Sequence, residues 1–324
     1  MKKILVIGGA GYVGSELVDC MLNKYHVTVY DLFIYGETLP DNKNLKKIRG
    51  DIRNIENLKK IIKEFDYVIH LACISNDPSF DLDPELGKSI NFDPFEDLVK
   101  ICKNSGVKRF IYASSSSVYG IKSTKDVDEN SSLEPLTDYS KFKAMCEDIL
   151  IKYTDKNFVG TIIRPATVCG FSKRQRLDLV VNILTNLAYN SGEITIFGGD
   201  QLRPNINIKD MCQSYMQVLD ADISLVKGEI FNVGFENYPV KYLANIVKDV
   251  VGKNVKLKTV QTNDNRSYHI SSKKIEKNIG FKTQFTIKDA VIDLKKAFEK
   301  NFFTNPLENE LYFNIKRMNS IKLK

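Results

Sequence analysis

Apolar and polar positions alternate along the first half of the chain with two different periods. Short apolar runs predict buried strands, and the segments between them repeat apolar residues at the spacing of amphipathic helices. The expected strands are 3–7, 27–30, 45–49, 67–70, 108–113 and 159–164. Helical patterns begin near Gly14, Asn54, Pro84, Thr137 and Arg176. This alternation predicts an α/β fold whose parallel sheet is covered by helices on both faces.

The pattern changes after Gly170. Shorter apolar pieces are separated there by polar segments such as FGGDQLRPN, NVGFENYP and QTNDNRSYH. We therefore expect a first domain over 1–170 and a smaller, loop-rich α/β portion over 171–324. Some strands and helices of the second part are expected to return to the first, because no Pro-rich linker separates them.

The first strand runs directly into the segment GGAGYVG, in which Gly8, Gly11 and Gly14 have the spacing GxxGxxG. The first glycines allow a tight turn and the close approach of a pyrophosphate to backbone N–H groups, and the third allows helix and strand to pack closely. A glycine pattern alone also fits an ordinary turn. In this context it predicts a Rossmann domain, a doubly wound parallel sheet, with Tyr12 and Val13 beside the dinucleotide.

The second strand ends in VYD. Asp31 stands where a carboxylate accepts hydrogen bonds from an adenosine ribose and repels a 2′-phosphate. The sequence therefore predicts NAD rather than NADP as the cofactor.

Composition excludes several other classes of protein. The formal charge of +7 comes from lysines spread along the whole chain, which is typical of solvated helix faces rather than a nucleic-acid groove. The six cysteines form no CxxC pair and do not cluster with the three histidines, so neither a disulfide framework nor a metal site is expected. The run Ile4 to Ile7 is too short for a signal peptide, and no apolar run reaches membrane-helix length. We expect a cytoplasmic protein.

Two Tyr-x-x-x-Lys sequences place a tyrosine and a lysine on one helix face, at Tyr139 to Lys143 and at Tyr312 to Lys316. The first opens a helix after the fifth strand and its serine-rich end, whereas the second lies in a basic tail. A lysine ammonium and the positive nicotinamide ring of NAD⁺ would lower the pKa of the Tyr139 phenol and make it a base. A serine hydroxyl facing the phenol would hold the substrate alcohol.

The chain resembles the nucleotide-sugar epimerase/dehydratase family of extended short-chain dehydrogenases/reductases. The segments GGAGYVG, VYD, RGDIRN, HLA, SSSSVYG, YSKFK, RPATVCG, LRPNINIKD, FNVG and NDNRSYHIS appear in the family's order. Each segment alone is a weak match to the family, but the complete set in this order is specific for it. Within the family the chain also resembles a bacterial polysaccharide-pathway subgroup that includes GDP-manno-heptose 4-dehydrogenases, which implies a role in making surface polysaccharide or capsule sugars.

The resemblance implies roles for individual positions. Ser115 joins Tyr139 and Lys143 as the catalytic set. Asp51 and Ile52 would flank the adenine. The other positions expected at the cofactor are Leu71, Ala72, Asn91, Ala113, Ser114, Tyr139, Lys143, Pro165 and Val168.

The substrate site is expected to combine matching and non-matching positions. Arg203 and Arg266 match the arginines that clamp the substrate diphosphate. Thr167 replaces a family Asn, so a sugar contact could come from Arg174, Arg176 or Asn182, although a helix cap and solvated turn fits these residues equally. The remaining candidates are Ser75, Asn76, Ser115, Ser116 and Ser117. Ser75 and Asn76 lie in CISNDPSFDLDP, whose Asp and Pro residues also suit a helix N-terminus.

Ser116 and Ser117 distinguish reaction types within the family. Sugar 4,6-dehydratases carry Asp and Glu at these positions to eliminate water, and a serine hydroxyl cannot serve readily as that acid or base. The expected chemistry is therefore oxidation of a hexose or heptose C4 hydroxyl, as a 4-dehydrogenase or as the first half of a 4-epimerase. A dehydratase and a non-catalytic NAD-binding regulator are the alternatives.

The resemblance also implies a homodimer or higher homo-oligomer. The contact would use the helix before the fifth strand and the helix that carries Tyr139. Apolar side chains there could form either the contact or the core: Phe92, Phe95, Leu98, Phe142, Met145 and Ile149.

Overall fold

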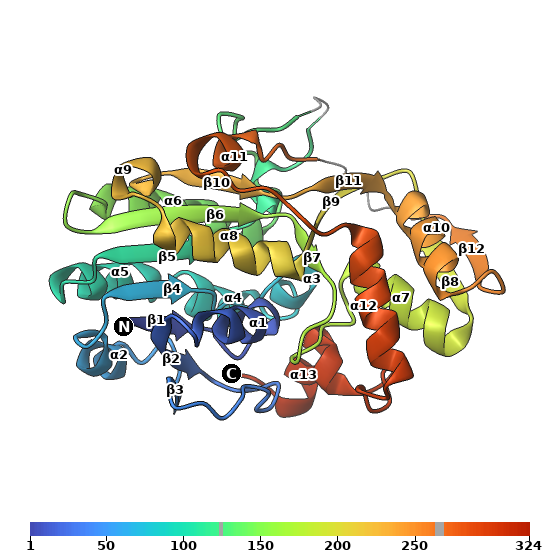
Figure 1. Cartoon of the computed structure of the whole chain (residues 1–324), viewed down its shortest axis with the longest axis horizontal. Coiled ribbons are helices and arrows are strands. Elements are labelled where there is room, and N and C mark those ends of the chain that lie inside the picture. The colour runs from blue at the N-terminus through green and yellow to red at the C-terminus, as the bar shows by residue number, and fades with distance from the viewer. Residues whose placement is uncertain (123–125, 263–268) are drawn as a thin grey trace.

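Seven parallel strands form the central sheet of the computed structural model, which describes residues 1–122, 126–262 and 269–324 (Figure 1). From one edge to the other they are β10 (Ile230–Val233), β6 (Val159–Pro165), β5 (Arg109–Ala113), β4 (Tyr67–His70), β1 (Lys2–Ile7), β2 (Tyr25–Asp31) and β3 (Leu45–Arg49). Successive side chains point to opposite faces, so Ile4 and Val6 join one core and Leu5 and Ile7 the other.

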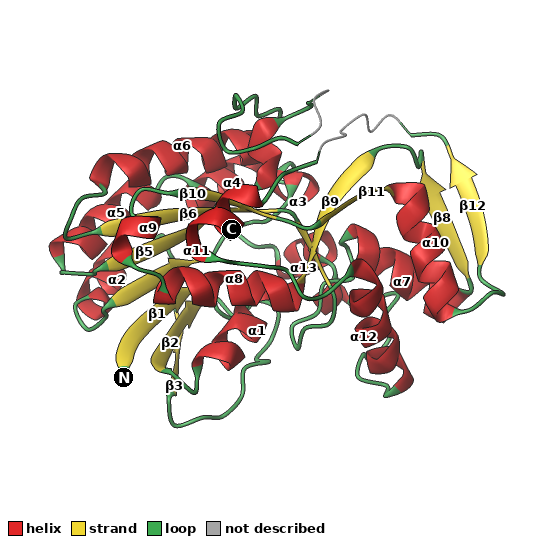
Figure 2. Ribbon diagram, turned by 45° about the horizontal axis from the view of Figure 1, so that its top comes forward, coloured by secondary structure: helices red, strands yellow, loops and turns green. Residues whose placement is uncertain are grey.

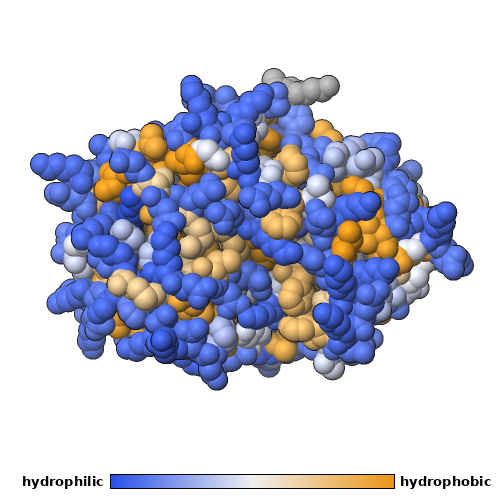
Figure 3. All heavy atoms as spheres, viewed as in Figure 1, coloured by the Kyte–Doolittle hydropathy of each residue, from blue (hydrophilic) through white to orange (hydrophobic). Residues whose placement is uncertain are grey.

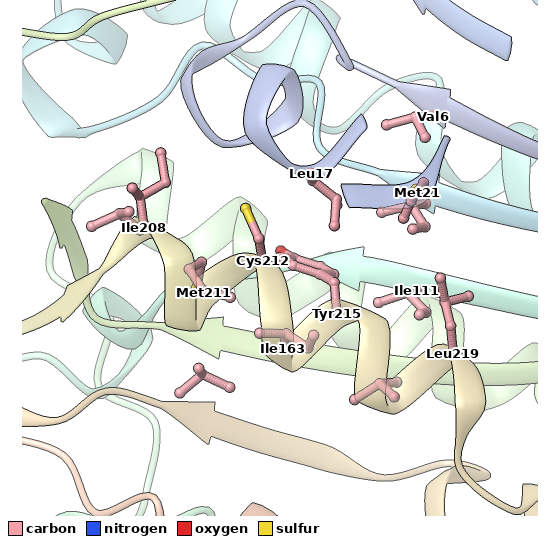
Figure 4. Close-up of a cluster of buried hydrophobic side chains, with 14 of the residues drawn as sticks. Val6, Leu17, Met21, Ile111, Ile163, Ile208, Met211, Cys212, Tyr215 and Leu219 are labelled. Carbon is pink, nitrogen blue, oxygen red and sulfur yellow. The ribbon is translucent and has the colours of Figure 1, made fainter. Parts of the chain in front are cut away.

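Helices cover both faces of this sheet. One face packs against α1 (Tyr12–Met21), α8 (Ile208–Asp220), α9 (Ile223–Val226) and α11 (Lys273–Ile279). The other packs against α2 (Ile55–Ile62), α3 (Asp77–Phe80), α4 (Pro84–Asn91), α5 (Phe95–Asn104) and α6 (Asp138–Tyr153). Figure 4 shows the first core, where side chains of α8 lie between α1 and the strands. The predicted doubly wound Rossmann class is confirmed.

The smaller lobe packs three helices, α7 (Val180–Ser191), α10 (Val240–Val251) and α12 (Ile287–Glu299), against short strands (Figure 2). The strands form a three-stranded sheet of β11 (Glu236–Pro239), β9 (Leu202–Asn207) and β7 (Thr167–Cys169), and a pair of β12 (Lys256–Val260) and β8 (Glu193–Phe197). The segments η2 (Glu310–Tyr312) and α13 (Asn314–Ile321) then return toward β2. The division at residues 170 and 171 remains a prediction, since α8 and β10 belong to the large domain.

All six strands predicted from the sequence form. The helix expected near Arg176 begins only at Val180, because the preceding residues are held as a loop against α1. There the Ser172 hydroxyl lies 2.8 Å from the Ser15 hydroxyl and donates to the Tyr12 carbonyl at 2.8 Å. A tertiary contact therefore replaces the first turn that the local pattern suggested.

The six apolar residues considered for a subunit contact fall into different environments. Phe95 and Leu98 are fully buried in the protomer's own core, whereas Met145 on α6 is 45% exposed. The homo-oligomer remains a prediction, and only part of the apolar set is available for it. The face seen in Figure 3 carries separate hydrophobic patches among hydrophilic residues. Within the described residues, no helix has the length and apolar character needed to cross a membrane.

His70 at the end of β4 packs against the rings of Phe95 and Tyr112, with ring centroids 5.7 Å away in both cases. Burial, with a smaller effect from the Lys143 charge, lowers the pKa of its imidazole from 6.5 to about 3. Between these values the unfolded chain binds the extra proton. The stability that His70 contributes is therefore complete above about pH 6.5 and is lost as the pH falls toward about 3.

We expect His70→Leu to weaken the acid sensitivity of folding. The free energy of unfolding, measured with urea at about pH 7 and about pH 5, should fall less between the two conditions in this variant than in the parent protein. His26→Leu, at an exposed position, is the control and should keep the parent's difference. Equal differences in all three proteins would mean that His70 is not buried as a neutral group.

Candidate active site

A cavity of about 440 Å³ lies where the carboxyl ends of the central strands face the smaller lobe. Ligands of open α/β sheets bind at this edge. Its lining comes from the turns after β1, β4, β5 and β6, from the first residues of α6, and from β9 and α13. The cavity thus joins the predicted cofactor motif to the Ser, Tyr and Lys motif.

The glycine-rich turn requires its glycines for steric reasons. A Cβ at Gly8, where φ is +85°, would lie 2.3 Å from the backbone nitrogen of Ala72. A Cβ at Gly14 would lie 2.5 Å from the carbonyl oxygen of Gly8. The turn therefore brings the amino end of α1 to the cavity, which Gly8, Gly11, Tyr12, Val13 and Gly14 all line.

Asp31 is held beside this turn rather than within the cavity lining. Its carboxylate accepts hydrogen bonds from the backbone N–H groups of Ala10 at 3.0 Å and Phe33 at 2.8 Å. Burial raises the pKa of the carboxyl above its usual value, while those two hydrogen bonds and the charges of Arg174 and Arg49 oppose the shift. The position fits the predicted ribose contact, which remains a prediction.

Other positions expected at the cofactor have structural partners. The Asn91 side chain accepts a hydrogen bond from the Ile74 backbone N–H at 2.8 Å and donates one to the Ile74 carbonyl at 2.9 Å. It therefore fixes the loop after β4. Asp51 pairs with Arg53 at 2.6 Å. Asp51, Ile52, Ala72 and Asn91 do not line the cavity, whereas Leu71, Ala113, Ser114, Pro165 and Val168 do.

The four serines that follow β5 line the cavity but differ in their hydrogen bonds. Ser115 caps the short helix η1 (Ser116–Tyr119), accepting from the Ser117 backbone N–H at 3.1 Å, and its hydroxyl lies 2.8 Å from the Ser117 hydroxyl. Ser114 donates to the buried carboxylate of Glu147. Ser115, Ser116 and Ser117 all line the cavity, so this strand end presents hydroxyl groups to a ligand.

Tyr139 and Lys143 lie one turn apart at the start of α6, which the capping box of Thr137 and Ser140 begins. The Lys143 ammonium donates to the Ala113 carbonyl at 2.6 Å and lies 5.8 Å from the centroid of the Tyr139 ring. It is thereby fixed between the serine-bearing strand end and the phenol.

Burial raises the pKa of Tyr139 well above its usual value, and the nearby Cys73 and Asp77 add to this shift. A hydrogen bond from Ser115 and the charge of Arg176 act in the opposite direction. Among these groups the effects that raise the phenol pKa are the larger. The expectation that Lys143 and the nicotinamide ring together lower it remains a prediction.

The predicted substrate residues divide into three groups. Outside the serine segment, the predicted substrate residues that line the cavity are Ser75, Asn76, Thr167, Arg174, Arg176 and Arg203. Asn182 does not line it. Asn182 is fully buried and bonds the Gly170 N–H, the Arg176 carbonyl and the Tyr12 hydroxyl. It therefore holds the loop between β7 and α7 in place. Arg266 lies outside the described residues.

The cavity lining also includes residues that were not predicted, among them Tyr35, Asp77 and Asn314. Asp77 accepts a hydrogen bond from the Thr137 hydroxyl at 2.6 Å. Asn314 begins α13, in the tail whose Tyr-x-x-x-Lys match suggested only surface or packing roles. No local motif marks these residues, because long-range folding alone brings them to the cavity.

Comparisons with known proteins agree with this geometry. A family model described as the NAD dependent epimerase/dehydratase family matches residues 4–234. The chain is 28% identical over 252 residues to a UDP-glucose 4-epimerase of Lactobacillus helveticus, which covers 72% of this chain and 76% of that protein. It is 27% identical over 326 residues to the dTDP-D-glucose 4,6-dehydratase of Homo sapiens, with 93% and 91% covered.

A solved structure of a similar protein has the same overall fold. The UDP-N-acetylglucosamine 4-epimerase from Methanobrevibacter ruminantium M1, in complex with UDP-N-acetylmuramic acid, matches with a TM-score of 0.84 and 26% identity. The match covers 93% of this chain and 99% of that one. The steric need for Gly8 and Gly14 and the carboxylate at the end of β2 fit the family's cofactor. The chain belongs to the NAD-dependent epimerase/dehydratase family, and NAD is its cofactor.

Proposed function

We propose that this protein oxidises the C4 hydroxyl of a nucleotide-activated sugar and acts as a 4-epimerase. The observation that carries the proposal is the convergence of Ser115, Tyr139 and Lys143 on one cavity that also contains the glycine-rich turn. Relatives named as 4-epimerases match most of the chain, which supports the same substrate class. A hexose or heptose made for a surface polysaccharide remains our expected substrate.

Tyr139, Ser115 and Lys143 have separate roles in the proton transfer. The Tyr139 phenolate takes the proton of the C4 hydroxyl, while Ser115 holds that hydroxyl in line. NAD, when bound, would supply the acceptor for the hydride that leaves C4. Lys143 keeps the phenolate charge balanced, because its ammonium is anchored on the Ala113 carbonyl close to the ring. The reverse transfer to the other face of the 4-keto sugar inverts the centre.

The position of α13 favours epimerisation over net oxidation. Arg317 donates to the Ile34 carbonyl at 2.5 Å, and Arg53 donates to the Lys324 carbonyl at 2.7 Å. These contacts lay the last residues across the loops after β2 and β3, on the expected adenosine side. An epimerase regenerates its NAD in every turnover and gains from retaining it, whereas a 4-dehydrogenase must exchange or reoxidise it.

A 4,6-dehydratase is the second candidate, and one observation favours it. Asp77 and Asp178 are the acids in the described cavity lining, and Asp77 lies close enough to raise the pKa of Tyr139 after the larger effects of burial and Cys73. A single carboxylate could serve as an acid for water loss. Ser116 and Ser117 nevertheless leave the strand end without the acid–base pair that dehydratases carry there.

The test is a panel of UDP-, GDP-, CDP- and dTDP-sugars incubated with the protein and NAD⁺. Sugar NMR should detect an inverted C4, and absorbance at the reduced-nicotinamide band should show no net NADH. A free 4-keto sugar with matching NADH would instead identify a dehydrogenase, and a 4-keto-6-deoxy sugar a dehydratase. Absence of turnover with every sugar would favour a non-catalytic NAD-binding regulator.

A further inference from the structure

Two buried arginines face the cavity with unused hydrogen-bonding capacity. The side chains of Arg174 and Arg176 are 3% and 7% exposed. Nε of Arg174 and Nη2 of Arg176 have no hydrogen-bond partner within the described structure, although both residues line the cavity. Because a buried, unpaired donor of a charged group costs free energy, this arrangement indicates a ligand that accepts hydrogen bonds.

The charges around the pair also call for an anion. Arg176 pairs with Asp178 at 2.8 Å, while Arg174 stacks on Tyr35, with its guanidinium carbon 3.5 Å from the ring centroid. Burial lowers the pKa of Arg174 to about 10, and the neighbouring charge of Arg176 contributes, so the group stays protonated near neutral pH. Asp178 is bonded to Arg176, whereas Arg174 has no carboxylate bonded to it among the described residues and is affected by Asp178 and Asp31 only through their charges.

The other contacts of the two guanidinium groups hold them in place. Arg174 donates to the Asn314 side chain of α13 at 2.8 Å, and Arg176 donates to the Ser75 hydroxyl at 2.9 Å. Asn314 also donates to Ser75 at 3.1 Å. These side chains from three distant segments tie the pair together and leave its free nitrogens to the ligand.

The segment that carries the arginines is fastened to the first turns of α1. Besides the contacts of Ser172 described above, the Lys173 backbone N–H donates to Glu16 at 3.0 Å. The positive charge of Arg174 acts to lower the pKa of the Asp31 carboxyl, and that of Arg176 acts to lower the pKa of the Tyr12 and Tyr139 phenols, although burial raises all three. Both arginines line the cavity that the amino end of α1 also lines, where the diphosphate of a dinucleotide binds.

We propose that Arg174 and Arg176 bind the diphosphate of NAD from the side opposite the glycine-rich turn. The substrate diphosphate is the competing ligand, and the sequence also allowed a contact with the sugar. The stacking of Arg174 on Tyr35, its charge effect on Asp31 and the anchoring of the same loop on α1 favour the cofactor, because these groups lie on its expected adenosine half. The proposal rests on NAD as cofactor and not on the sugar reaction proposed above.

Calorimetric titration of NAD⁺ into the protein without nucleotide sugar tests this assignment. We expect Arg174→Gln and Arg176→Gln each to raise the Kd for NAD⁺ and for ADP-ribose about 10- to 100-fold, the effect of losing a charge-assisted hydrogen bond. The Kd for adenosine, which has no phosphate, should stay within about threefold. Arg174→Lys should restore only part of the affinity, because an ammonium lacks the planar fork.

Lys173→Gln is the matched control, since Lys173 is the adjacent cation but pairs with Asp19 outside the cavity. It should leave the Kd for NAD⁺ unchanged, and an equal loss there would overturn the proposal in favour of a general charge effect. Asn314→Ala removes the neutral side chain that bonds both Arg174 and Ser75, and it should weaken NAD⁺ binding severalfold without removing a charge. It provides a second variant if the arginine variants misfold. An unchanged Kd for NAD⁺ with a raised KM for the nucleotide sugar would assign the arginines to the substrate. Sugar turnover could fail while the NAD⁺ result holds, so the two proposals are tested separately.

Discussion

Tyr139→Phe should lower turnover of the nucleotide sugar by about a thousandfold or more while leaving NAD⁺ affinity within a few-fold of the parent. The variant removes only the hydroxyl that takes the C4 proton, and general-base catalysis contributes roughly 10²- to 10⁴-fold. The phenol ring keeps its packing against Phe80, whose centroid lies 6.3 Å away, so the fold should be retained. Steady-state turnover and calorimetric titration measure the two effects.

The pH dependence of the rate of sugar oxidation tests the role of Tyr139 independently. Burial raises the pKa of Tyr139, so the phenolate fraction increases with pH through the neutral range. The rate of sugar oxidation should therefore rise with pH in the parent, and this rise should be lost in Tyr139→Phe. Tyr312→Phe, which changes the second Tyr-x-x-x-Lys match, is the control and should behave as the parent. Parent-like turnover of Tyr139→Phe would remove Tyr139 as the base.

Arg164→Met should lower the free energy of unfolding by about 3–5 kcal/mol, because it leaves a buried carboxylate without its charge partner. Arg164 bonds Glu147 through Nε and Nη2, the latter at 2.5 Å, and both side chains are at most 3% exposed. Burial alone would lower the pKa of Arg164, but the contacts with Glu147 more than offset this and raise it. Urea-induced unfolding measures the loss.

The control for that prediction is an exposed ion pair on the same side of the sheet. Lys100→Met removes the contacts of Lys100 with Glu96 and Asp97 on α5 and should change the free energy of unfolding far less than Arg164→Met does. Combining Arg164→Met with Glu147→Leu should recover much of the stability, since no unpaired charge then remains. Equal small losses from Arg164→Met and Lys100→Met would mean that the pair is not buried in solution.

The large domain could be predicted well because its signals are local. Each strand of the first half is a short apolar run, and GGAGYVG and VYD stand at strand ends where their positions relative to the sheet are known in advance. The same reasoning brought Tyr139 and Lys143 to the serine-rich end of β5, because they open the next helix, and the family resemblance selected Ser115 among the serines. The structure places all three on one cavity.

The rest of the site depends on contacts that no local pattern encodes. The segment around Arg176 looked like the start of a helix, but hydrogen bonds of Ser172 to α1 hold it as a loop. Asn182 looked like a ligand contact and is instead a buried support for that loop. Asn314 comes from a segment far along the chain, so its approach to Arg174 appears only when the chain is folded.

The most direct test of C4 oxidation follows deuterium placed at C4 of the nucleotide sugar that the panel identifies. Hydride transfer at C4 predicts transient deuterated NADH in a single turnover with the isolated protein, followed by an epimer that keeps its deuterium at C4 in ordinary water. Mass spectrometry of the sugar and of the released cofactor measures both. Loss of the C4 deuterium to solvent, or an epimer formed without any deuterium reaching the nicotinamide, would contradict C4 oxidation by Ser115, Tyr139 and Lys143.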